Sequence, residues 1–76
     1  MYFSSIYIYD KQGRAVKGKK VSISISGFLS GGTADAFTDS LGCANIYHSS
    51  TGNAKIFVDG RNVANFTSPG KASINI

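Results

Sequence analysis

IYIYDKQG (residues 6–13), TDSLGCANI (residues 38–46) and IFVDG (residues 56–60) are three stretches that share one pattern and decide the fold. Each sets an Asp and a Gly beside alternating apolar residues. An Asp side chain caps a turn, and Gly adopts the positive φ angle that other residues resist. Alternation with a period of two is typical of a β-strand with one buried face. The pattern therefore predicts short strands joined by tight turns.

The sequence predicts an all-β chain without helices. No window places apolar residues at helical spacing, and the 9 Gly residues together with many Ser and Thr disfavour a helix. The clearest strand is VSISIS (residues 21–26). The expected strands are residues 3–9, 20–26, 33–38, 43–48, 53–58, 61–66 and 71–76. Turns at this spacing indicate a β-sandwich or a β-barrel, in a single domain, residues 1–76.

Two turns carry specific chemistry. Asp59-Gly60 stands between two β runs, which suits a two-residue type I′ hairpin. Ser68-Pro69-Gly70 places Pro and Gly at the positions that a tight turn favours. Both turns are expected to separate consecutive strands.

The small size of the chain limits what it can bury. A domain of 76 residues has marginal stability, and a single cysteine excludes an internal disulfide. Small domains without such crosslinks often gain stability by associating with a protein partner or with themselves. No secretory signal or apolar membrane span is visible. A cytoplasmic location is expected if the sequence is a whole product, and none is assigned if it is one domain of a longer protein.

The strands sort their side chains into an aliphatic and an aromatic set. In the first strand Ile6 and Ile8 share one face, whereas Tyr7 and Tyr9 share the other. We expect the aliphatic set to form the core and the aromatic set to be partly exposed. Exposed aromatic residues often mark interfaces, although a core that mixes both sets would explain them equally well. The candidate partner-binding residues of this set are Tyr7, Tyr9, Tyr47 and Phe57.

A second candidate surface is the glycine-rich stretch GFLSGG (residues 27–32). It lacks the Gly-Lys-Ser/Thr sequence of a phosphate-binding loop. Phe28 and Leu29 are unusual residues for a solvent-exposed loop. They either insert into a partner or fold back to cap the sandwich.

The net charge of +4 is concentrated in residues 1–20. Lys11, Arg14, Lys17, Lys19 and Lys20 stand there against a single Asp, which gives 5 − 1 = +4, and the remaining residues carry 3 − 3 = 0. Such a segment is either a solvated loop or a patch that binds an anion or nucleic acid. Because Tyr7 and Tyr9 adjoin it, nucleic-acid binding is the alternative function.

No catalytic, metal-binding or cofactor-binding group is predicted, so the chain is not expected to be an enzyme. Cys43 and His48 lie five positions apart on one strand, which places them on opposite faces. His48 is expected to be a packed or edge residue. Asp39 and Asp59 are explained as turn caps, and together with Asp35 they show no spacing that would make acidic side chains converge on a cation.

The order of motifs resembles that of the transthyretin-like β-sandwiches, which include carboxypeptidase regulatory-like and CNA-B-type Ig-like modules. The matching residues are Asp10, Gly13, Val16, Gly18 and Val21; Thr38, Asp39, Gly42, Ala44 and Ile46; Ala54, Ile56 and Val58. The resemblance implies a seven-stranded antiparallel Ig-like sandwich used as a stalk, an adaptor or a partner-binding module, with these residues in structural roles. The chain has no Glu and a single His, unlike the crosslinked and hydrolytic members of the group.

Overall fold

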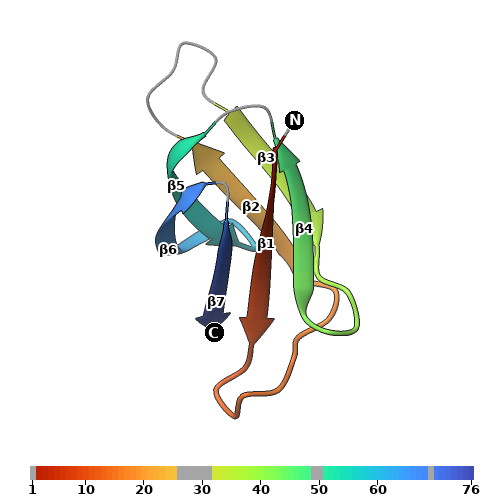
Figure 1. Ribbon diagram of the computed structural model, residues 1–76. Helices are drawn as coiled ribbons and strands as arrows, with labels where there is room; N and C mark the ends of the chain where they lie inside the picture. Colours follow the sequence, from red (N-terminus) through yellow and green to blue (C-terminus); the bar gives the residue numbers. More distant parts are fainter. Residues whose placement is uncertain (1, 26–31, 49–50, 69) are drawn as a thin grey trace.

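The computed structural model describes residues 2–25, 32–48, 51–68 and 70–76, which form seven strands and no helix (Figure 1). The all-β class is therefore confirmed, and each expected strand is found within two residues of its predicted bounds. Phe28, Leu29 and Pro69 lie outside the described residues. The strands are β1 (Tyr2–Tyr9), β2 (Lys20–Ile25), β3 (Gly32–Phe37), β4 (Cys43–His48), β5 (Gly52–Val58), β6 (Arg61–Ser68) and β7 (Lys71–Asn75).

The strands form two sheets. The three-stranded sheet has the order β4-β1-β7, and the four-stranded sheet has the order β3-β2-β5-β6. All pairings are antiparallel except that of β1 with β7, which is parallel. The prediction of a fully antiparallel arrangement was therefore wrong. The chain passes from the four-stranded to the three-stranded sheet between β6 and β7, and β7 pairs with β1. The turn residues before β7 do not indicate which strand it pairs with.

The aliphatic side chains of both sheets form one core. The buried cluster takes Ile6, Ile8, Ala44, Ile46 and Ile74 from the three-stranded sheet, and Val21, Ile23, Ile25, Ala54, Ile56 and Val58 from the four-stranded sheet. The predicted inward position of the aliphatic set is thus confirmed for β1, β2, β4 and β5, and Ala34 and Ala36 of β3 pack against this core partly buried. Because side chains alternate along a strand, the residues between these positions lie on the two outer faces.

Two Asp-capped turns lie at the same end of the molecule (Figure 1). Asp10 Oδ1 accepts hydrogen bonds from the backbone N–H groups of Gln12 at 2.8 Å and Arg14 at 2.9 Å. Asp39 Oδ1 does the same for Leu41 at 2.9 Å and Cys43 at 3.1 Å. The expected side-chain caps are therefore confirmed for Asp10 and Asp39. For Asp59 the expectation of a cap was wrong, because its carboxylate accepts a 3.1 Å hydrogen bond from Lys19 Nζ instead.

Gly42 joins these two turns. Its φ is +76°, and an added Cβ would lie 2.6 Å from the carbonyl oxygen of Ile8. Its own carbonyl accepts a 2.7 Å hydrogen bond from the N–H of Ile8. Only glycine combines this φ with so close a backbone approach.

The Asp59-Gly60 turn has the expected form. Both residues have positive φ, 51° and 84°, as a type I′ hairpin requires. The turn places Arg61 directly opposite Val58 in the β5–β6 register.

Candidate functional site

The outer surface of the three-stranded sheet is the part of the molecule where aromatic residues gather, and we call it the aromatic face. It is formed by alternate residues of three neighbouring strands, Phe3, Ser5, Tyr7 and Tyr9 of β1, Cys43, Asn45 and Tyr47 of β4, and Lys71, Ser73 and Asn75 of β7. Three of the predicted partner-binding residues, Tyr7, Tyr9 and Tyr47, are therefore brought to one surface. Ile6 and Ile8 lie on its inner side, in the core.

The most exposed part of the aromatic face is a pair of rings. Phe3 on β1 is paired with Tyr47 on β4, and their ring centroids are 5.7 Å apart at an angle of 40°. Phe3 is 53% exposed and Tyr47 is 64% exposed. A cross-strand aromatic pair contributes to sheet stability, but this pair leaves most of its apolar surface in water. Phe3 was not among the predicted site residues, although it shares the strand parity of Tyr7 and Tyr9.

The middle of the aromatic face is held by polar contacts. Ser5 Oγ donates a 2.9 Å hydrogen bond to Asn45 Oδ1, and Cys43 Sγ lies 3.5 Å from the same oxygen. Tyr7 is half-buried beside Cys43. The hydrogen bond with Cys43 is the main reason that the pKa of Tyr7 lies above its ordinary value. Tyr7 thus lies over the cysteine, and Phe3 and Tyr47 are the most exposed rings of the aromatic face.

Phe57 does not belong to the aromatic face. It lies on β5 and is paired with Ser22 of β2, so it is on the outer surface of the four-stranded sheet. The prediction that grouped it with Tyr47 was therefore wrong. Strand parity distinguishes an inner from an outer position, but it does not tell which of two sheets a strand joins.

Two further apolar residues are exposed near the β3–β4 connection, and neither was predicted as a site residue. Phe37 at the end of β3 is 67% exposed, and Leu41 in the Asp39 turn is 72% exposed. Phe37 shows the same strand parity as the aromatic set, which is the signal that would have found it. Leu41 has no such signal, because a turn has no parity.

Three of the five cations predicted for an anion site are paired with carboxylates. Arg14 lies 3.7 Å from Asp10. Lys19 lies 3.1 Å from Asp59, and Lys20 lies 3.7 Å from Asp35. Lys11 and Lys17 are exposed, and within the described ranges neither forms an ion pair. The segment therefore presents less free positive charge than its composition suggests.

The pKa values of two turn carboxylates, those of Asp10 and Asp59, lie below their ordinary value. The backbone N–H of Arg14 is the main cause that lowers the pKa of Asp10, and the hydrogen bond from Lys19 is the main cause for Asp59. The lowered pKa of Asp10 is thus explained by its turn, and that of Asp59 by its contact with Lys19.

A buried polar cluster at one end of the core was missed by the sequence analysis. His48 Nε2 lies 2.9 Å from Ser4 Oγ and 3.1 Å from Ser68 Oγ, and the two hydroxyls are 3.3 Å apart. Ser4 is fully buried, and the ring of Tyr2 stacks on His48. A serine beside a histidine suggests nucleophilic catalysis, but here the hydroxyl faces the core. We therefore interpret these hydrogen bonds as a structural contact, in agreement with the expectation of a packed histidine.

No protein-family model matches the chain, and a search of curated proteins finds no match to it. Within the described ranges there is no group of three His, Cys, Asp or Glu side chains that could hold a metal ion. None of the described segments is a helix long and apolar enough to cross a membrane.

Proposed function

We propose that this chain is a non-enzymatic protein-interaction module, and that its two sheets form an Ig-like sandwich related to the transthyretin-like group. The observation that carries the proposal is the exposed Phe3–Tyr47 pair on the aromatic face. Tyrosine and phenylalanine are enriched in protein interfaces, where they contribute large contact areas at low conformational cost. The partner is another protein or a second copy of the chain.

The surroundings of the pair support a protein partner. Ser5, Asn45 and Lys71 share one cross-strand row next to the rings. An apolar centre beside polar groups that can donate and accept hydrogen bonds is the usual anatomy of an interface. The hydrogen bond between Ser5 and Asn45 fixes these groups before a partner arrives, which lowers the ordering cost of binding.

A comparison of three variants with the unmodified protein tests the proposal. Tyr47→Ser and Phe3→Ser remove one ring each, and Phe37→Ser removes an equally exposed ring from the other sheet as the matched control. Sedimentation velocity over a concentration series measures self-association, and quantitative capture from a lysate of the source organism measures binding to other proteins. We expect Tyr47→Ser and Phe3→Ser to weaken the association at least about tenfold, and Phe37→Ser to leave it unchanged. A monomeric protein whose capture of partners is the same in all variants would contradict the proposal.

A further inference from the structure

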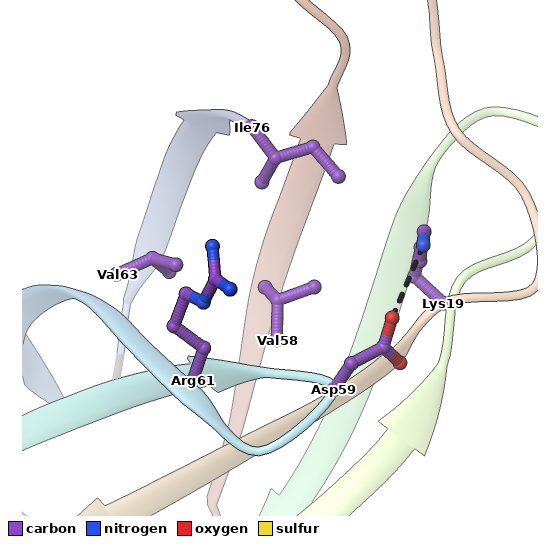
Figure 2. Close-up of a pocket in the computed structure, with 6 residues that line it drawn as sticks. All are labelled: Lys19, Val58, Asp59, Arg61, Val63 and Ile76. Carbon is purple, nitrogen blue, oxygen red and sulfur yellow. Dashed lines mark hydrogen bonds and ion pairs between the residues drawn. The ribbon is translucent and has the colours of Figure 1, made fainter.

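A pocket outside the aromatic face lies where the β5–β6 turn meets the residue that follows β7. It has a volume of about 310 Å³, at the lower end of the range of small-molecule sites. Its lining is Lys19, Val58, Asp59, Arg61, Val63 and Ile76 (Figure 2). None of these residues belongs to the aromatic face.

The positions of the lining residues are fixed by backbone pairing. The positive φ angles of Asp59 and Gly60 close the turn and set Arg61 opposite Val58. The N–H of Ile76 donates a 2.8 Å hydrogen bond to the carbonyl of Tyr9, which holds Ile76 beside the end of β1. The side chain of Arg61 runs along Val58 and Val63 towards Ile76 (Figure 2). The pocket is therefore preformed by the strands around it.

The charges of the pocket leave one cation without a counter-ion. Lys19 Nζ lies 3.1 Å from Asp59 Oδ2, and this contact lowers the pKa of the carboxyl, so the two groups form a neutral pair. Within the described residues no carboxylate lies within ion-pair distance of Arg61. The net charge of the lining side chains is thus +1, from Lys19 and Arg61 against Asp59.

We propose that this pocket binds a monocarboxylate with an apolar body, either a small free acid or the carboxyl-terminal residue of a peptide. The planar guanidinium of Arg61 matches a carboxylate with two parallel hydrogen bonds. Lys19 keeps two further N–H donors after its contact with Asp59. Val58, Val63 and Ile76 offer apolar surface to the body of the ligand. Asp59 stands at the side of the pocket and repels a second negative charge.

A titration followed by two-dimensional ¹H–¹⁵N NMR tests this site with four probes. These are 4-methylpentanoate, its carboxamide, acetyl-Gly-Gly-Leu with a free carboxylate, and the same peptide with a carboxamide end. We expect at least one of the carboxylates to shift the amide signals of Arg61, Val63 and Ile76. The matching carboxamide should bind about tenfold more weakly. Binding of the acid alone identifies a free metabolite as the ligand class, and binding of the peptide alone identifies a chain terminus.

Two variants make the test specific to the guanidinium. Arg61→Gln should weaken binding of the carboxylate about tenfold. Lys55→Gln removes the same charge from an exposed residue outside this pocket, and should bind like the unmodified protein. The proposal is overturned if neither carboxylate shifts these signals, if carboxylate and carboxamide bind equally, or if the two variants behave alike. The carboxamide comparison uses the unmodified protein, so it holds even where Arg61→Gln perturbs folding.

Discussion

Phe3 and Tyr47 stand opposite each other in the antiparallel β1–β4 register, with ring centroids 5.7 Å apart and more than half of each residue exposed. The two rings shield each other only in part. Burying apolar area stabilises a folded protein, and the aliphatic core of this domain is small. The monomer gains no such stabilisation from the apolar area that it leaves in water. A partner that covers Phe3 and Tyr47 would bury this area, and the stabilisation would then favour the complex. We therefore propose that the interface includes this pair.

Gly42→Ala is predicted to destabilise the fold by about 2–4 kcal/mol, because the new Cβ combines an unfavourable φ with a clash against backbone. The clash is with the carbonyl oxygen of Ile8, at 2.6 Å. Gly13→Ala is the matched control, since Gly13 has a similar φ of 84° but no atom within 4 Å of the added Cβ. Its cost should be about 1 kcal/mol. Urea unfolding of both variants measures the difference, and equal losses would show that the contact with Ile8 carries no cost.

Ser4→Ala is predicted to lower the free energy of unfolding by about 1–2 kcal/mol, because it removes a buried hydroxyl that is hydrogen-bonded to His48 Nε2. Ser73→Ala removes an exposed hydroxyl from β7 and should change stability by less than about 0.5 kcal/mol. Thermal and urea unfolding provide the comparison. If the two variants proved equally stable, the polar cluster would have no part in holding this end of the core.

The protein is predicted to lose stability in acid through Asp10 and Asp59. Their pKa values are lowered in the folded state, by the N–H of Arg14 and by Lys19 respectively. A carboxyl with a lowered pKa stabilises the fold above its unfolded pKa of about 4, and this contribution is lost as the pH falls through the folded value.

Urea midpoints at about pH 6 and about pH 2.5 measure this effect. The double variant Asp10→Asn with Asp59→Asn keeps amide oxygens as acceptors but cannot titrate. It should show a smaller drop between the two pH values than the unmodified protein does. The same drop in both proteins would assign acid sensitivity to other groups.

If residues 11–20 bind single-stranded nucleic acid, we expect the affinity to depend only weakly on salt. Lys11 and Lys17 are the two cations of that segment without an ion pair in the described residues. Two phosphate contacts correspond to a slope of about −1.5 in a plot of log K against log salt.

Fluorescence anisotropy with a labelled oligonucleotide gives this slope. Lys11→Gln with Lys17→Gln should abolish the residual binding, whereas Lys19→Gln with Lys20→Gln should have little effect. A slope near −3.5, as expected for five phosphate contacts, would show that the ion pairs open on binding and would restore the nucleic-acid alternative.

Local features of the fold could be predicted because they depend on neighbouring residues. The alternation of Ile6 and Ile8 with Tyr7 and Tyr9 specifies an inner and an outer side. Asp59-Gly60 specifies its own turn, because few other dipeptides accept two positive φ angles. The strands, the core positions and the turns could therefore be predicted from local features of the sequence.

The candidate site could be predicted only in part, because it depends on which strands share a sheet. Tyr47 and Phe57 look equivalent in the sequence, yet β4 and β5 lie in different sheets. The parallel pairing of β7 with β1 could not be predicted either, because no residue near β7 in the sequence indicates which strand it pairs with. The ion pair of Lys19 with Asp59 joins residues forty positions apart, and such pairs follow from the register once the sheets are known.

The most direct test of the interface is site-specific photocrosslinking. A p-benzoylphenylalanine residue placed at position 47 keeps an aromatic ring on the aromatic face, and the same residue at position 57 probes the outer surface of the four-stranded sheet. The account predicts an ultraviolet-dependent crosslink to a protein partner, or to a second copy of the chain, from position 47 and not from position 57. A crosslink from position 57 alone, or equal crosslinks from both positions, would contradict the assignment of the interface to the Phe3–Tyr47 surface.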